Sequence, residues 1–162
     1  MGILSDVRVR QPAKDDLVGR RFVVSGIGTG FEGTIGIRVL KGTKVIATGS
    51  AQSSGGNGAL GEFVTHVTVP KPPRAGTRLR VEVFGDTGEG SGTDVRTVEV
   101  LMYPDLAGWL LYRVEPGDTL TGIVRTARDF GRTTVAQIVA ANSQIEDPDV
   151  IQVGWRLRIP LS

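Results

Sequence analysis

The chain has 162 residues, of which 40% are hydrophobic and 22% are charged, a composition typical of folded globular proteins and not of disordered tails. A formal net charge of +2 is too small to indicate nucleic-acid binding, and the absence of cysteine excludes disulfides and cysteine metal sites. With His66 as the only histidine, a histidine-cluster metal site is excluded too. No apolar run approaches the length of a membrane span. No signal peptide is visible at residues 1–10, so either the protein is not secreted by that route or the numbering begins after a removed leader.

The first hundred residues predict short strands separated by glycine-rich turns. Three segments alternate apolar and polar residues, as expected of strands with one buried face, at 34–40, 63–69 and 78–84. Further strands are expected near 7–10, 20–27, 44–49 and 94–102. Seven short strands at this spacing predict an antiparallel immunoglobulin-like β-sandwich over residues 1–103.

Residues 104–110 are expected to link this sandwich to a second domain. Tyr103-Pro104-Asp105 interrupts the last strand, because proline cannot donate a ladder hydrogen bond. The segment is not a Gly/Ser tether, and its Leu106, Trp109 and Leu110 are apolar enough to pack between domains. A fairly fixed orientation of the two domains is therefore expected.

The remaining residues, 111–162, predict the order strand, helix, helix, strand. After a short strand at 111–114, Asp118 or Thr119 is well placed to cap a helix that runs to about Arg128. A second helix is expected from Thr133 or Thr134 to Asn142, followed by a polar loop. The final strand is expected at 156–159, stopped by Pro160. Two strands at the ends of this segment can pair antiparallel and pack against both helices, as in a small α+β domain.

The residues of this second domain resemble the LysM family. The opening is Tyr112-Arg-Val-Glu-Pro-Gly-Asp-Thr-Leu120 and the ending is Gly154-Trp-Arg-Leu-Arg-Ile-Pro160, with Ile123, Ile138, Asn142 and Ile151 between them. The match covers essentially all of residues 111–160 in the family's order and spacing. The sequence departs from the family where Thr121 replaces a frequent tryptophan and where Gly122 weakens the first helical turn.

The resemblance implies a shallow groove between the loop after the first strand and the loop before the last strand. In the family this groove accepts the N-acetyl groups of chitin or peptidoglycan glycan. Leu120 and Ile151 would offer apolar surface to acetyl methyl groups, and little salt dependence is expected because the sugar is neutral. Carried over position by position, the two walls are Gly117, Asp118, Thr119, Leu120 and Thr121, and Pro148, Asp149, Val150 and Ile151.

Several of these residues also have a purely structural interpretation. Asp118 and Thr119 are suited to cap a helix, and Gly117 to form a turn with positive φ. Leu120 and Ile151 are consistent with core positions. The groove assignment therefore depends on the resemblance and not on residue chemistry alone.

Two other residues of the second domain have more than one interpretation. Asn142 is expected to cap the second helix or organise the next loop, in preference to contacting a ligand. Trp155, where the family frequently has glutamine, either forms a stacking platform for sugar or packs against the first domain.

The first domain resembles the immunoglobulin-like domain of bacterial sporulation and germination proteins. The residues that carry the resemblance, over about 5–102, are Val18-Gly-Arg-Arg-Phe-Val-Val-Ser-Gly26, Gly30-Phe-Glu-Gly33, Gly61-Glu-Phe63 and Gly76–Phe84. The resemblance implies a non-catalytic, extracytoplasmic sandwich. Glu32 is the residue of most interest there, with a structural hydrogen bond to a neighbouring loop as its expected role.

Catalysis is not expected, and neither is a cofactor or a metal site. His66 shares one strand face with Val64 and Thr68, so it is expected to be a solvated sheet residue and not a general base. A sandwich has little room for a cleft flanked by two carboxylates, which glycosidases need. The available carboxylates lie in turns or beside polar residues, at Glu62, Glu82, Asp86, Glu89 and Asp94.

The sequence as a whole predicts a non-catalytic, extracytoplasmic protein associated with the cell wall, with assembly in the cytoplasm as the alternative because no signal peptide is visible. In this interpretation the C-terminal domain binds peptidoglycan or a chitin-type glycan, and the sandwich is a spacer or docks a protein partner. The alternative is an assembly protein of a filament, spore coat or phage-tail-like particle, in which the LysM-like fold packs against protein. A third possibility is an accessory subunit of a hydrolase whose catalytic chain is separate.

Overall fold

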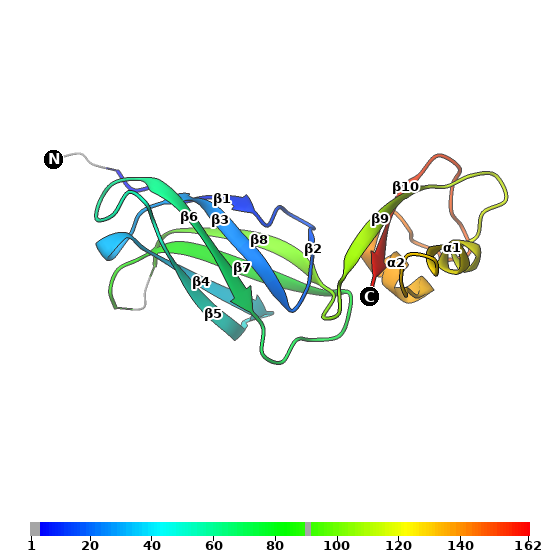
Figure 1. The fold of residues 1–162 in the computed structure, drawn as a ribbon, viewed down its shortest axis with the longest axis horizontal. Coiled ribbons are helices and arrows are strands. Elements are labelled where there is room, and N and C mark those ends of the chain that lie inside the picture. Colours follow the sequence, from blue (N-terminus) through cyan, green and yellow to red (C-terminus); the bar gives the residue numbers. More distant parts are fainter. Residues whose placement is uncertain (1–3, 90–91) are drawn as a thin grey trace.

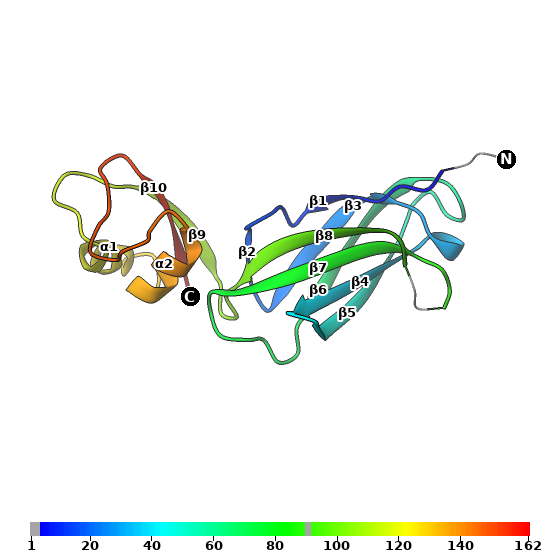
Figure 2. The same cartoon turned by 180° about the vertical axis from the view of Figure 1, so that it is seen from behind.

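The computed structural model of the protein describes residues 4–89 and 92–162, which form a β-sandwich followed by a smaller α+β module. Figures 1 and 2 show the two parts lying end to end along the long axis of the molecule. The segment that leads into the first strand lies at the end of the sandwich that is far from the module (Figure 1). The expected division into a sandwich and a βααβ unit is confirmed.

Two sheets face each other in the sandwich. The first has the order β1–β3–β6, made of Arg8–Gln11, Arg21–Gly28 and Gly61–Thr68. The second has the order β2–β8–β7–β4–β5, made of Leu17–Val18, Gly92–Met102, Thr77–Asp86, Thr34–Lys41 and Lys44–Gln52. A short 3₁₀ helix, η1 (Phe31–Gly33), connects β3 to β4. All strand pairs are antiparallel except β2 with β8, which is parallel.

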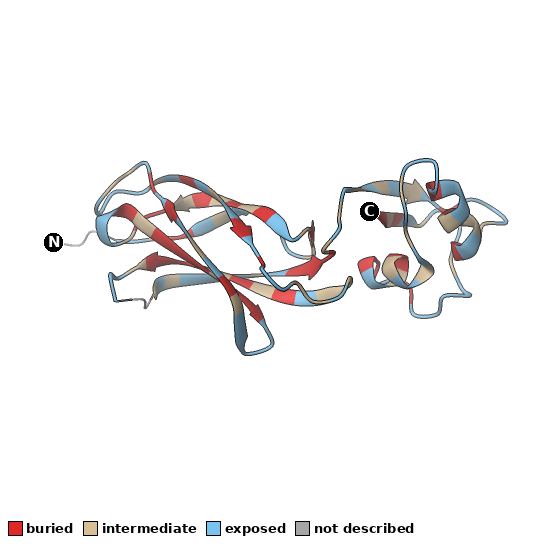
Figure 3. Ribbon diagram, turned by 60° about the horizontal axis from the view of Figure 1, so that its bottom comes forward, coloured by how far each residue is buried: buried red, intermediate tan, exposed pale blue. Residues whose placement is uncertain are grey.

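The core of the sandwich contains the apolar face of each expected strand. Ile37 and Val39 of β4 pair with Val83 and Val81 of β7 across the ladder, and all four are buried together with Ile35. Figure 3 shows how buried positions alternate with exposed ones along the strands. The seven expected strands are all present, and the two-residue strand β2 is additional. Because two residues are too short to show a periodicity, the sequence pattern did not predict it.

The module consists of β9 (Gly108–Arg113), α1 (Leu120–Ala127), α2 (Val135–Ala141) and β10 (Arg156–Leu161). The two strands pair antiparallel, from Arg156 opposite Arg113 to Leu161 opposite Gly108. Both helices contribute to one small core, where Ile123 and Ile138 are buried with Leu157. Within the described residues, no helix has the length and hydropathy needed to span a lipid bilayer.

The boundaries of the module's strands differ from those expected. β9 begins at Gly108, so residues 108–110 of the expected linker belong to the strand. β10 continues through Pro160 instead of stopping there. Proline is tolerated because this sheet has only two strands, and each strand has one edge without a ladder partner. Trp109 was expected between the domains, but it is about half exposed on the surface of β9.

A small apolar cluster joins the two parts of the molecule. It contains buried Leu101 and Tyr103 from the sandwich side and buried Ala141 from α2, with Leu106 of the linker packed against them. The Tyr103 hydroxyl donates a hydrogen bond of 2.9 Å to the Gln137 carbonyl in α2. Burial raises the pKa of Tyr103 to about 12, because the charged phenolate is poorly solvated there.

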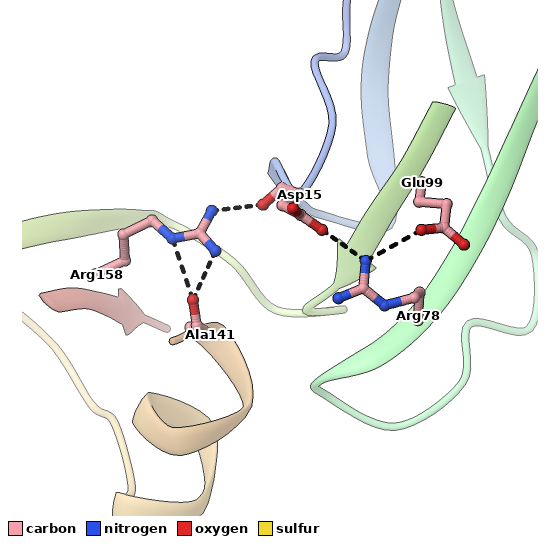
Figure 4. A network of polar contacts seen from close by, with 5 residues as sticks. All are labelled: Asp15, Arg78, Glu99, Ala141 and Arg158. Carbon is pink, nitrogen blue, oxygen red and sulfur yellow. Dashed lines mark hydrogen bonds and ion pairs between the residues drawn. The ribbon is translucent and has the colours of Figure 1, made fainter. Parts of the chain in front are cut away.

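Arg158 of β10 connects the same joint through polar contacts (Figure 4). Its Nε and Nη2 atoms donate to the Ala141 carbonyl at 3.1 and 2.6 Å, and Nη1 donates to the Asp15 carbonyl of the sandwich. The Asp15 carboxylate in turn lies 2.6 Å from Nη1 of Arg78, which also approaches Glu99 at 3.6 Å. The joint is therefore formed by buried side chains and by hydrogen bonds to backbone carbonyls.

Candidate functional site

The loop that follows β9 is organised by one carboxylate. Oδ2 of Asp118 accepts a hydrogen bond from the Tyr112 hydroxyl at 2.9 Å and one from the Glu115 backbone N–H at 2.7 Å. The hydrogen bond to Asp118 raises the pKa of the Tyr112 hydroxyl. Gly117 has a φ of 89°, which a residue with a side chain rarely adopts, so its turn role is confirmed.

Both helices of the module begin with a threonine cap. Oγ1 of Thr119 accepts a hydrogen bond from Gly122 N at 3.1 Å, and Oγ1 of Thr134 accepts one from Gln137 N at 3.2 Å. Each cap satisfies a backbone donor that the first helical turn leaves free. Of the two expected caps for α1, Thr119 has this role and Asp118 organises the preceding loop.

Side-chain hydrogen bonds of buried Asn142 and exposed Asp147 fix the loop between α2 and β10. Asn142 is 3% exposed and joins α2 to β10, because its Nδ2 donates to the Ile138 and Arg158 carbonyls, each at 2.7 Å. Its Oδ1 accepts from Arg158 N at 2.8 Å. Further along, Oδ1 of Asp147 accepts from Asp149 N at 2.9 Å. The expected role of Asn142 as helix cap and loop organiser is confirmed.

The two loops enclose a groove with a volume of about 160 Å³. It lies at the end of the module that faces away from the sandwich, as the loops after β9 and before β10 show in Figures 1 and 2. The lining residues are Asp118, Thr119, Leu120, Thr121, Val135, Pro148, Asp149 and Ile151. The structure thus brings together residues of both expected walls.

The groove differs from the expected set at three positions. Gly117 and Val150 do not line it, and Val150 is 56% exposed. Val135, the first residue of α2, lines the groove although the sequence analysis did not include it. Only the packing of α2 beside α1 brings Val135 there, so no local sequence signal identifies it.

Comparison with protein families identifies both parts of the molecule. Residues 6–91 match the immunoglobulin-like domain of bacterial spore germination, and residues 112–160 match the LysM domain. The chain belongs to the first of these families and carries a LysM domain at its C-terminal end.

Two individual proteins show more distant similarity. The secreted LysM effector ECP6 of Passalora fulva is 44% identical over 50 residues, which are 31% of this chain and 20% of that protein. The chain therefore matches about a fifth of the length of this relative. Among solved structures, the crystal structure of an engineered protein aligns with a TM-score of 0.44 and 20% identity, over 61% of this chain and 20% of that one.

The groove of the LysM domain combines an apolar floor with a polar rim. Leu120 is only 2% exposed and belongs to the core, so the accessible apolar surface comes from exposed Pro148 and from partly buried Val135 and Ile151. Thr121 and Asp149 are exposed at the rim. Such a groove suits a neutral ligand that has methyl groups and hydrogen-bonding groups close together.

The structure gives the environments of the other residues that the sequence analysis singled out, Trp155, Glu32 and His66. Trp155 is partly buried against the core of the LysM domain itself and is not part of the apolar cluster at the joint with the sandwich. Gln52, the last residue of β5, donates a hydrogen bond to the backbone carbonyl of Glu32, so the contact at Glu32 is with a strand and not with the expected neighbouring loop. His66 is exposed on β6, as expected. In residues 4–89 and 92–162, no group of three His, Asp or Glu residues is arranged to hold a metal ion.

Proposed function

We propose that this protein binds N-acetylglucosamine-containing glycan in the groove of its LysM domain and does not cleave it. The observation that supports this proposal is the groove itself, in which residues from two loops far apart in the sequence line one cavity of about 160 Å³. The LysM match over residues 112–160 and the similarity to a secreted LysM effector point to the same class of ligand.

The lining residues fit the chemistry of an N-acetylated sugar. Val135 and Ile151 can contact the acetyl methyl group, while Thr121 and the backbone of the 148–151 loop can hydrogen-bond to the amide and hydroxyl groups. Lysine and arginine are absent from the lining residues, as expected for a ligand that needs no charge neutralisation. The bound polymer is either peptidoglycan or a chitin-type glycan.

We propose two roles for the sandwich. It is either a spacer between the LysM domain and a structure at the opposite end of the sandwich, or a domain that docks a protein partner. The two loops that line the groove and the segment that leads into β1 lie at opposite ends of the molecule (Figure 1), an arrangement that suits a spacer. In this role the protein is extracytoplasmic and associated with the cell wall. One LysM domain binds weakly by itself, so several copies on a surface would gain retention through avidity.

Co-sedimentation with insoluble chitin and peptidoglycan tests the proposal. The variant Thr121→Ala/Asp149→Ala removes polar groups from both rims of the groove, and we expect its retention to fall about tenfold through lost hydrogen bonds. The matched control is Thr126→Ala/Asp129→Ala, which has the same composition and charge but lies outside the groove lining. Equal retention of both variants, or equal loss, would exclude the groove as the binding site.

A second candidate function is docking to protein, which one feature of the LysM domain favours. A mostly apolar groove of about 270 Å³ lies between β9 and α1, where Leu111 and Phe130 are 51% and 66% exposed. Exposed apolar surface of this kind is typical of assembly interfaces. Absence of retention on both polymers, together with self-association that Phe130→Ser abolishes, would favour this assembly function.

A further inference from the structure

The two loops that form the groove are strongly acidic, although the whole chain has a net charge of +2. Neither residues 115–121 nor residues 143–152 contain lysine or arginine. Together they contain five carboxylates, at Glu115, Asp118, Glu146, Asp147 and Asp149. Two of these, Asp118 and Asp149, line the groove itself. The negative charge is therefore concentrated at the proposed glycan site.

None of these five carboxylates is neutralised by an ion pair within the described part of the chain. Asp118 accepts hydrogen bonds from a tyrosine hydroxyl and a backbone N–H, and Asp147 accepts one from a backbone N–H. These hydrogen bonds stabilise the loop conformations, but their donors carry no positive charge and so do not neutralise the carboxylates. All five except half-buried Asp118 are exposed.

The arginines of the LysM domain lie elsewhere. Arg113 and Arg156 face each other on the two strands, and Arg158 makes its hydrogen bonds at the joint with the sandwich. Arg125 follows the lining residue Thr121 by four positions and Arg132 precedes the lining residue Val135 by three, but neither arginine lines the groove. With five carboxylates in its loops and no lysine or arginine among its lining residues, the groove has a negative potential at its mouth.

We infer that the groove selects uncharged runs of N-acetylglucosamine and disfavours glycan that carries carboxylates, such as strands with free lactyl carboxyl groups of N-acetylmuramic acid. This inference rests on the proposed function and adds a specificity that the shape of the groove does not provide. A neutral oligomer experiences no net repulsion from the acidic loops, whereas an anionic one is repelled by all five charges together. Salt screens this repulsion over roughly 8 Å at physiological ionic strength.

The test measures binding of three tetrasaccharides to the full chain by isothermal titration calorimetry. The first is tetra-N-acetylglucosamine, and the second alternates N-acetylglucosamine with N-acetylmuramic acid. The third is the second with its carboxyl groups converted to methyl amides, which keeps the lactyl bulk but removes the charge. At low ionic strength we expect the anionic oligomer to bind about tenfold more weakly than its methyl amide. At 1 M salt the affinities of the two oligomers should differ by no more than about twofold.

A pair of charge variants assigns the effect to the loops. Glu146→Gln/Asp147→Asn removes two carboxylates outside the groove lining and keeps an oxygen at 147 to accept the Asp149 N–H. We expect this variant to reduce the tenfold preference for the methyl amide over the anionic oligomer to about threefold. The control Glu89→Gln/Asp129→Asn changes the net charge equally, at exposed positions outside the acidic loops, and is expected to leave the preference unchanged.

The outcomes separate this inference from the proposed function. If none of the three oligomers binds, the proposed function fails. If the neutral oligomers bind and the anionic one binds equally well at low salt, the proposed function stands and the charge selection is wrong. If both charge variants reduce the preference equally, the discrimination comes from net charge and not from the loops, which also overturns the inference.

Discussion

The two ends of the LysM domain are built in opposite ways. At the end that meets the sandwich, the side chains of Tyr103 and Asn142 are each 3% exposed, and their polar atoms are hydrogen-bonded. At the groove end, Thr121 and Asp149 are exposed and belong to none of the buried clusters. Helix α2 reaches both ends, because Ala141 contacts the joint while Val135 lines the groove.

This difference indicates where substitutions should affect stability and where they should affect binding. Buried groups that lose a hydrogen-bond partner destabilise a protein strongly, whereas exposed polar side chains contribute little to folding. Changes at the joint end should therefore lower the free energy of unfolding. Changes at the groove rim should weaken glycan retention and leave the fold intact. The predictions below test this separation, from the largest expected effect to the smallest.

The largest effect is expected for Asn142→Ala. The substitution removes three hydrogen bonds, leaving the Ile138 and Arg158 carbonyls and the Arg158 N–H without that partner between α2 and β10. We expect the free energy of unfolding to fall by about 3 kcal/mol, measured by urea denaturation followed by circular dichroism. Asn57→Ala, at an exposed loop position, is the control and should change it by less than about 0.5 kcal/mol. Equal effects of the two variants would contradict the structural role of Asn142.

An intermediate effect is expected for Tyr103→Phe, and it should depend on pH. Between pH 10 and about 12, an unfolded tyrosine has lost its proton while the buried Tyr103 keeps it, since burial raises its pKa to about 12. Raising the pH through this range therefore favours the unfolded state, by about 1.4 kcal/mol per pH unit. Below pH 10 this contribution is absent, and only the hydrogen bond to Gln137 is lost, at a cost of about 1 kcal/mol.

Denaturation curves at pH 7, 10 and 11.5 measure this dependence. The variant should be less stable than the original protein at pH 7, and the difference should shrink or reverse at pH 11.5. An unchanged difference between the two proteins across all three pH values would show that Tyr103 ionises as freely in the folded chain as in the unfolded one.

The smallest effect on stability is expected for Thr119→Ala, which removes the cap of α1. Loss of one capping hydrogen bond costs about 1 kcal/mol, and thermal unfolding should show a correspondingly lower midpoint. Thr119→Ser keeps the hydroxyl and should restore most of the stability. Thr121→Ala, two residues further on, should leave the midpoint nearly unchanged because Thr121 is not the cap. If the unfolding midpoint fell more for Thr121→Ala than for Thr119→Ala, the assignment of Thr119 as the helix cap and of Thr121 as a binding residue would be wrong.

Local sequence determined most of the secondary structure. Period-two alternation gave the strands that contain Ile35, Leu79 and Phe63, because one face of each strand must be buried. Threonine at positions 119 and 134 gave the helix starts, because a hydroxyl there satisfies a free backbone N–H. The acidic character of the two groove loops is likewise evident from residue types alone.

Tertiary structure decided which of these residues meet. The parallel pairing of β2 with β8, the passage of β10 through Pro160 and the position of Val135 in the groove all depend on contacts between distant segments. The packing of partly buried Trp155 against its own domain and the half-exposed position of Trp109 have the same origin. A side chain's neighbours across the fold depend on packing of the whole domain, and a local pattern of residue types does not contain that information.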